Sequence, residues 1–287
     1  MSDKIIRALA LNDEIRLFIV DTKDLVEKTR KLHQMFPTSA AALGRTMSVA
    51  TIMGSMLKDE KEKLKIEIRG SNEIEYILVD AFNNGNVRGL ISNPQVFMVN
   101  EANGKLDVGG AIGAGTLKVI KETEGQSSFV SQVDLQTGEI GDDFVYYFAQ
   151  SEQIPSALSV GVLVNEDLSI ASAGALLFQV LPSASDESID QVEKVLSNLP
   201  AISSLLLEKD AEEILLSLFD DVRILDENEL QFECTCNREQ MLSALATLTK
   251  EDLQTMIDED KGATLECHYC HSQYPFSEDE LRNLLVD

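Results

Sequence analysis

The sequence predicts an α+β protein with a large N-terminal mixed domain, a helical linker and a small C-terminal domain. Three observations predict this fold class: alternating segments in the first 180 residues, helical repeats after residue 181, and four cysteines that all lie after residue 233. At 287 residues the chain exceeds one typical domain, and its 44% hydrophobic share is that of a globular protein. We therefore expect domains over residues 1–180, 181–228 and 229–287.

The first domain contains segments typical of half-buried strands. Residues 63–69 and 73–80 alternate apolar with polar side chains, as a strand with one buried face does. Asn83-Asn-Gly-Asn follows the second of these segments and marks a turn before the next apolar run. The sequence therefore predicts two strands and a turn over this region.

Two core helices are predicted in the same domain. Residues 38–57 are rich in Ala and Met with apolar residues about one helical turn apart, and Pro37 suits the first turn of such a helix. Residues 138–150 predict a second helix with Phe144, Tyr147 and Phe148 on one side.

Apolar residues recur at helical spacing in residues 182–228. The two repeats, on either side of Pro200, are Ile189, Val192, Leu196 and Leu199, then Ala211, Ile214, Leu215 and Leu218. They predict short amphipathic helices with acidic polar faces. Such a segment can pack permanently on a neighbouring domain, or it can detach and expose its apolar stripe, because short helices gain most of their stability from packing. The pattern leaves both alternatives open.

The four cysteines form two pairs, Cys234 with Cys236 and Cys267 with Cys270. Two such pairs can supply a tetrahedral thiolate set for one zinc ion. Each pair is also close enough to close on itself as a disulfide, and the single residue between Cys234 and Cys236 gives an unusually tight ring, which hints at redox chemistry. His268 and His271 could replace one thiolate, but four cysteines already complete the coordination shell, so we predict four sulfur ligands.

A small C-terminal domain needs such a site. Fewer than 60 residues bury too little surface to fold securely alone, whereas zinc in a four-thiolate site adds on the order of 10 kcal/mol of folding free energy. Thiolates are also the groups that peroxide attacks, so their oxidation would remove the ligands and unfold the domain together. The alternative is a static structural zinc site.

Charge and hydropathy exclude several classes of protein. The net charge of −25, with 49 acidic against 24 basic residues, would repel nucleic acid. The longest apolar run, residues 170–181, is too short to span a membrane. We also find no secretory signal at the N-terminus, so we expect no nucleic-acid partner, no membrane partner and a cytoplasmic location where thiols are reduced.

No catalytic constellation is predicted. The glycine-rich segment 109–115 lacks the spacing of a nucleotide-binding loop, so we interpret it as a flexible turn between strands. His33 is the only histidine outside the cysteine region. Glu139, Asp142 and Asp143 begin a predicted helix, where acidic side chains interact favourably with the helix dipole. We therefore expect a protein that is not an enzyme.

Several motifs taken together resemble one known family. They are Gly44-Arg45, Gly109-Gly110-Ala111 before Gly115-Thr-Leu-Lys-Val, Gly138-Glu-Ile-Gly-Asp-Asp-Phe, Ser151-Glu-Gln-Ile-Pro-Ser-Ala, Gln179-Val-Leu-Pro and the two cysteine pairs. In this order the chain resembles the heat shock protein 33 family, the redox-regulated chaperones also described as 33 kDa chaperonins. The resemblance spans nearly the whole chain.

The resemblance implies a holdase that works without ATP. It implies a reduced, zinc-bound resting state with Cys234, Cys236, Cys267 and Cys270 as ligands. On oxidation, Cys267 would pair with Cys270 first, zinc would leave, the C-terminal domain and linker would loosen, and Cys234 would pair with Cys236. It further implies a homodimer on activation and unfolded client proteins as partners. The alternatives are a thiol-disulfide oxidoreductase using Cys267 and Cys270, and a static zinc-stabilised interaction module.

Overall fold

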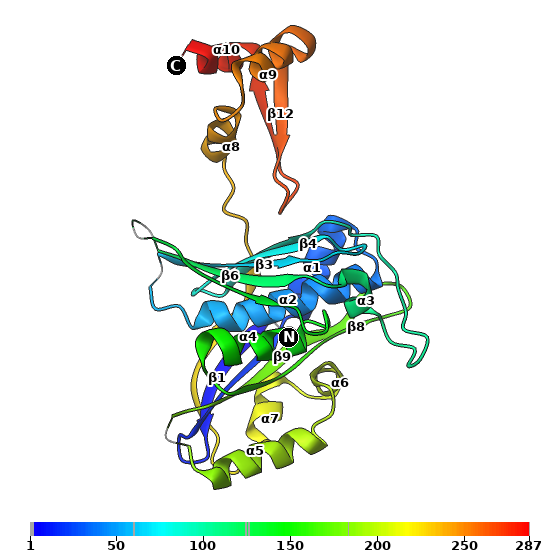
Figure 1. Cartoon of the computed structure of the whole chain (residues 1–287), viewed down its shortest axis with the longest axis vertical. Coiled ribbons are helices and arrows are strands. Elements are labelled where there is room, and N and C mark those ends of the chain that lie inside the picture. The colour runs from blue at the N-terminus through cyan, green and yellow to red at the C-terminus, as the bar shows by residue number, and fades with distance from the viewer. Residues whose placement is uncertain (1–2, 60, 124, 126, 183, 287) are drawn as a thin grey trace. The chain divides into compact units, whose positions relative to one another are not determined.

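The computed structural model describes residues 3–59, 61–123, 125, 127–182 and 184–286. The chain divides into two compact units, Met1–Glu233 and Cys234–Asp287, each of which mixes helices with strands (Figure 1). This confirms the predicted α+β class. The division of the chain into three domains at residues 180 and 228 stays a prediction.

The first unit contains a five-stranded antiparallel sheet in the order β10-β1-β2-β9-β8. Its strands are β1 (Lys4–Ala10), β2 (Ile15–Asp21), β8 (Ser156–Val164), β9 (Ile170–Val180) and β10 (Arg223–Glu229). Strand β9 is buried along almost its whole length because both faces of the sheet are covered there. Strand β10 is largely exposed and forms one edge of the sheet.

A six-stranded sheet in the order β11-β5-β4-β3-β6-β7 forms the second layer. Its strands are β3 (Glu62–Arg69), β4 (Tyr76–Phe82), β5 (Asn86–Ile91), β6 (Thr116–Thr123), β7 (Phe129–Asp134) and β11 (Gln231–Phe232). Strand β3 confirms the strand predicted at 63–69. Strand β4 begins later than predicted, because the backbone of Ile74 bonds to Ala111 instead of to a neighbouring strand. The predicted turn is present, with Gly85 at a φ of 81°.

The core helix α2 (Pro37–Ser55) lies between the two sheets (Figure 1). Many of its buried residues are small, and buried hydroxyls in its middle donate to the preceding turn: Thr46 donates to Ala42 O at 2.8 Å and Ser48 donates to Gly44 O at 2.9 Å. In its first turn, Thr38 and Ser39 donate instead to backbone carbonyls outside the helix. The helix predicted over 38–57, with Pro37 in its first turn, is confirmed. Helix α1 (Lys23–His33) precedes it. Among the described residues, no helix combines the length and apolarity that crossing a membrane requires.

Helix α4 (Gly141–Tyr147) continues into a π-helical turn, Phe148–Glu152. It confirms the helix predicted over 138–150, although it begins three residues later because residues 137–140 form a tight turn. Phe144, Tyr147 and Phe148 are buried as predicted.

Three short helices follow β9: α5 (Asp186–Asn198), α6 (Ile202–Glu208) and α7 (Ala211–Leu216). Their apolar side chains join Ile6, Ala8 and Leu17 of the first sheet in one hydrophobic cluster. The predicted amphipathic helices are therefore present, and they are packed on the sheet. Helix α6 and strand β10 were not predicted.

The second unit contains α8 (Arg238–Leu245), α9 (Lys250–Thr255) with a π-helical turn, the hairpin β12 (Gly262–Glu266) and β13 (Gln273–Ser277), and α10 (Glu278–Val286). Its hydrophobic cluster has few fully buried members, which are Leu245, Leu253, Ile257, Phe276 and Leu281. A core of this size supports little stability by itself.

Candidate metal centre

The four cysteines occupy two loops of the second unit. Cys234 and Cys236 lie in the extended segment before α8, and Cys267 and Cys270 lie in the turn of the β12–β13 hairpin. Two backbone hydrogen bonds close this turn: Cys267 N donates to Ser272 O at 3.0 Å, and His271 N donates to Cys267 O at 2.7 Å. The extended segment and the hairpin turn therefore bring together two cysteine pairs that are far apart in the sequence.

The four sulfur atoms form one cluster. Cys234 Sγ lies 3.7 Å from Cys267 Sγ, and Cys236 Sγ lies 3.3 Å from Cys270 Sγ. All four sulfurs lie within 4.8 Å of one another. Four thiolates at about 2.3 Å from one tetrahedral metal ion would be about 3.8 Å apart, so the observed spacing fits such an ion.

None of the four cysteines, all of which the structure describes, is in a disulfide. The sulfur–sulfur distances of 3.3 Å and 3.7 Å are far longer than a disulfide bond of about 2.05 Å. The arrangement is therefore that of reduced cysteines facing a common centre. The predicted oxidised pairs, Cys234 with Cys236 and Cys267 with Cys270, stay a prediction.

The thiols differ in acidity. Burial raises the pKa of Cys236 to about 12 and also raises the pKa of Cys267, which is buried. Burial acts in the same direction on Cys270, but hydrogen bonds to Ser272 and to neighbouring thiols outweigh it and lower the pKa of Cys270 to about 7. Without a metal, therefore, Cys270 is the most acidic of these three thiols.

The histidines lie outside the sulfur cluster. The group of candidate ligand atoms within 4.8 Å of one another consists of the four sulfurs. His271 Nδ1 pairs instead with the Glu266 carboxylate at the hairpin. The cluster that could hold a metal therefore consists of four thiols without an imidazole, and the assignment of these four cysteines as the metal ligands stays a prediction.

Side chains around the cluster hold its loops in place. The hydroxyl of Tyr274 donates to Cys236 O at 3.1 Å and lies 3.2 Å from Cys236 Sγ. Arg238 lies over the ring of Phe276, at 4.4 Å from the ring centroid, and forms an ion pair of 2.8 Å with Glu280. These contacts join the Cys234–Cys236 loop to the hairpin and to α10. Sequence reasoning missed Tyr274, which lies on strand β13 of the unpredicted hairpin, and Arg238, the first residue of α8, whose partner Phe276 lies on the same strand.

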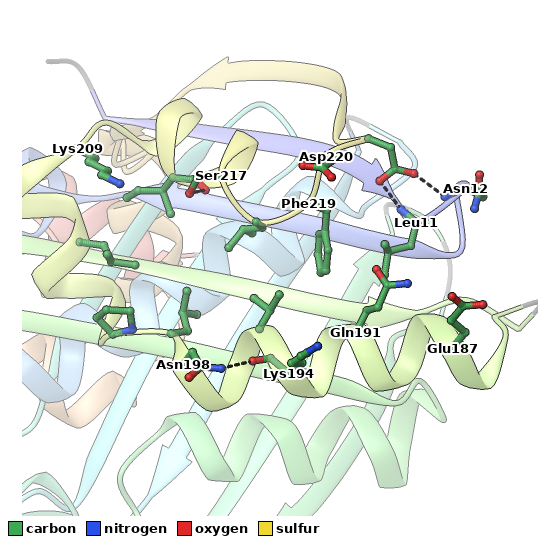
Figure 2. A pocket seen from close by; sticks show the side chains of 17 residues that line it. Leu11, Asn12, Glu187, Gln191, Lys194, Asn198, Lys209, Ser217, Phe219 and Asp220 are labelled. Atoms are coloured by element: carbon green, nitrogen blue, oxygen red, sulfur yellow. Dashed lines mark hydrogen bonds between the residues drawn. The ribbon is translucent and has the colours of Figure 1, made fainter.

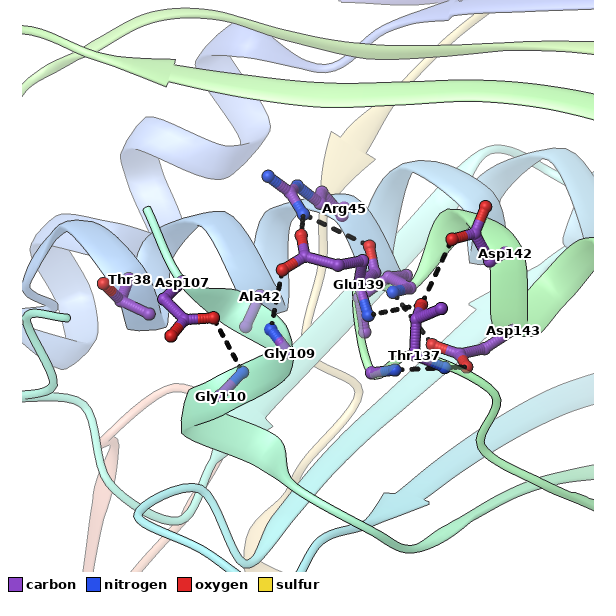
Figure 3. A network of polar contacts seen from close by, with 12 residues as sticks. Thr38, Ala42, Arg45, Asp107, Gly109, Gly110, Thr137, Glu139, Asp142 and Asp143 are labelled. Carbon is purple, nitrogen blue, oxygen red and sulfur yellow. Dashed lines mark hydrogen bonds and ion pairs between the residues drawn. The ribbon is translucent and has the colours of Figure 1, made fainter. Parts of the chain in front are cut away.

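The other candidate sites of the sequence are structural. The interpretation of the glycine-rich segment as a flexible turn is wrong, because it contains a short helix, α3 (Val108–Ile112). The backbone N–H of Gly109 donates to Glu139 Oε1 at 2.9 Å and that of Gly110 donates to Asp107 Oδ1 at 2.9 Å (Figure 3). The chain's own carboxylates thus occupy the N–H groups that a phosphate would need.

Replacement of Gly115 by alanine is expected to lower the free energy of unfolding by about 3 kcal/mol, because a Cβ there would lie 1.8 Å from Arg69 O. Gly104→Ala is the control: no atom lies within 4 Å, and its φ of 69° gives a cost of about 1 kcal/mol. Urea unfolding of both variants measures the difference. Equal destabilisation would show that close backbone packing does not govern this segment.

The predicted acidic cluster holds backbone groups together. Glu139 forms an ion pair of 2.7 Å with Arg45 (Figure 3). The buried carboxylate of Asp143 accepts hydrogen bonds from the backbone N–H groups of residues 136, 137, 138 and 140. These carboxylates therefore organise the turn that precedes α4.

The comparison with known proteins shows that this chain, a two-sheet unit followed by a four-cysteine unit, is similar to one class of chaperones. A solved structure from Thermotoga maritima, described as a 33 kDa chaperonin (heat shock protein 33 homolog), is 35% identical with a TM-score of 0.92, and the match covers 100% of this chain and 98% of that chain. The 33 kDa chaperonins of Staphylococcus carnosus and Clostridium botulinum are 41% and 44% identical, over 99% of this chain and 98% of each relative.

The family described as Hsp33 protein matches residues 3–277. The chain belongs to the Hsp33 family, which confirms the resemblance seen in its motifs.

Proposed function

We propose that this chain is a redox-regulated holdase chaperone that acts without ATP and is not an enzyme. In the reduced, metal-bound state it is inactive; oxidation of the four cysteines releases the metal and activates it to protect unfolding and oxidatively damaged proteins from aggregation. Family membership supports the chaperone role, and the single observation that supports redox control is the clustering of all four cysteines of the chain at one centre.

Zinc is the metal that this centre fits best. Four thiolates in a closed tetrahedral set are typical of structural zinc, and the sulfur spacing agrees with that geometry. When bound, zinc holds the two loops together and supplies folding free energy to a unit with a small core. Cys234, Cys236, Cys267 and Cys270 would bind one zinc ion per chain.

The oxidation step uses two thiolates and one peroxide molecule for each pair. A sulfur–sulfur bond forms, the O–O bond of the peroxide breaks, two electrons pass from sulfur to oxygen, and two protons complete two water molecules. We assign the pairs Cys267 with Cys270 and Cys234 with Cys236, as the family resemblance implies. Disulfide sulfurs no longer serve as thiolate ligands, so oxidation removes the metal and the stability that it provides.

Activation would expose the apolar side chains of the linker helices α5, α6 and α7. These helices leave an open hollow of about 1090 Å³ between α5, α7 and the β1–β2 turn (Figure 2). Leu207 and Leu216 of these helices are 55% and 47% exposed. Incomplete packing lowers the cost of local unfolding, which favours the alternative in which this segment detaches.

The proposal also includes the partners of the chain and its location in the cell. Unfolded proteins would bind apolar surface on the linker and the first unit, and activated protomers would dimerise. The net charge of −25 would keep the loaded complex soluble. A reducing cytoplasm would keep the four thiols ready to bind metal. The position of Cys267 and Cys270 in a hairpin turn, rather than at the start of a helix after a strand, gives no support to a thiol-disulfide oxidoreductase.

Light scattering of a thermally aggregating client tests the proposal. We expect the peroxide-oxidised chain to suppress most of the scattering at an equimolar ratio without ATP, and the reduced zinc-bound chain to leave it unchanged. Treatment of the oxidised chain with dithiothreitol and zinc is the control and should restore the inactive state. Equal suppression by both forms would reject redox control and favour a static zinc-stabilised module, and no suppression by either would reject the holdase.

A further inference from the structure

Strand β10 is attached to the first sheet by its backbone pairing with β1 and by exposed ionic contacts, with little burial of its side chains. Most of its side chains are exposed, including Leu225 at 40%. Arg7 Nε donates to Asp226 Oδ2 at 2.8 Å, and Lys4 Nζ lies 3.2 Å from Glu227 Oε1, with all four side chains partly exposed. Exposed ion pairs contribute little stability, so β10 is a weakly attached strand.

The pairing of β10 with β1 is also interrupted. Arg7 lies directly opposite Asp226, but the register shifts between Arg7 and Ala8, so that Ala8 faces Ile224. A shift of this kind leaves a residue out of the hydrogen-bond ladder. The other edge strand, β8, also contains a register shift, but none of its residues is exposed, so β10 is the more easily exchanged edge of this sheet.

Loss of β10 would turn β1 into an open edge with a defined chemistry. Ile5, Ile6 and Ala8 of β1 are buried, so the strand stays part of the core while its backbone N–H and C=O groups become available. Lys4 and Arg7 would then present two cations without their present partners. Such an edge binds an extended segment by strand addition, and its charges select the segment.

We propose that the β1 edge is a client-binding site, and that β10 is the internal segment that occupies it in the inactive chain. The preferred occupant is an extended client segment with an apolar residue at the place of Ile224, followed two and three positions later by acidic residues, as Asp226 and Glu227 follow it here. The inference rests on the proposed function, because it requires that oxidation loosen the segment that contains β10.

Two peptides and a charge-swapped protein test this site. One peptide carries residues 222–230 of the chain, and the other is identical except for arginine at the position of Asp226. The oxidised wild-type chain should bind the acidic peptide about fivefold more tightly in fluorescence anisotropy. The double variant Arg7→Glu with Asp226→Arg restores the internal ion pair with reversed sign, so it should stay closed when reduced and prefer the basic peptide when oxidised.

Further measurements keep the test decisive. A swap of the remote exposed pair, Lys65→Glu with Glu122→Lys, should leave the wild-type preference unchanged. In 1 M salt the wild-type preference should shrink, because exposed charges are screened, and this measurement does not depend on a variant that folds.

Two outcomes would overturn the inference: the same peptide ratio for the wild-type and charge-swapped chains, or no binding of either peptide by the oxidised chain. Client light scattering with the same oxidised samples separates the two proposals. Suppression of aggregation with an unchanged peptide ratio leaves the holdase standing and rejects the β1 edge, whereas no suppression rejects the holdase itself.

Discussion

Removal of the metal from the reduced chain is expected to unfold residues 234–287 and to leave the two-sheet unit folded. Among the described residues of the second unit, the hydrophobic cluster has five buried side chains, which is too small a core to offset the loss of chain entropy. The metal would supply on the order of 10 kcal/mol of folding free energy in a four-thiolate site, so the expected loss exceeds the total stability of such a unit.

Amide hydrogen exchange after chelation under reducing conditions measures this effect. Amides of Leu253, Ile257 and Phe276 should lose protection, whereas those of the core helix α2 should keep it. Cys267→Ser should behave like the chelated protein, and Thr235→Ala, which keeps all four sulfurs, is the matched control. Full protection of the second unit without metal would mean that its fold is independent of the four thiolates, and redox control through unfolding would then be wrong.

Asp143→Ala is expected to lower the free energy of unfolding by about 4 kcal/mol, because four backbone N–H groups would lose a charged acceptor. The same carboxylate holds a strained turn. Ile140 has a φ of 73°, and the N–H of Gly141 donates to Glu139 O at 2.9 Å, which is the geometry of the rare, strained γ-turn.

The neighbouring Asp142 is the matched control for this variant. Its side chain accepts from the Thr137 hydroxyl at 3.2 Å at the surface, so Asp142→Ala should change the free energy of unfolding by less than about 1 kcal/mol. Urea unfolding of the first unit, monitored by circular dichroism, provides the comparison. A small effect at both positions would show that other contacts maintain the turn without the Asp143 carboxylate.

The helices and strands that were predicted correctly are those whose local sequence has a clear apolar periodicity. Helix α2 was predicted because Pro37 and one apolar residue per turn favour a buried helix, and β3 because of its alternation. Strand β10 escaped prediction because Asp226, Glu227 and Glu229 have low strand propensity. It is a strand only because β1 offers a partner edge with Lys4 and Arg7 at the right positions.

The candidate site was likewise predicted only in part from the sequence. Cysteine spacing predicted four sulfur ligands, and the structure places the four sulfurs at one centre. The spacing did not predict the hairpin that carries Cys267 and Cys270, because β12 and β13 are short and their turn is stabilised by Ser272 and by His271, which adopts a positive φ of 56°. The hairpin is defined by hydrogen bonds between residues that no periodic pattern marks.

The sequence alone determined the α+β class, the amphipathic character of residues 182–228 and the family, because composition, periodicity and motif order are properties of the chain. Only the tertiary structure decided that the linker helices are packed on the first sheet and that an acidic segment closes its edge. The tertiary structure also decided that the four thiols, which lie on two separate loops, face one another. Each of these depends on contacts between distant segments, whose energies arise only when the chain is folded.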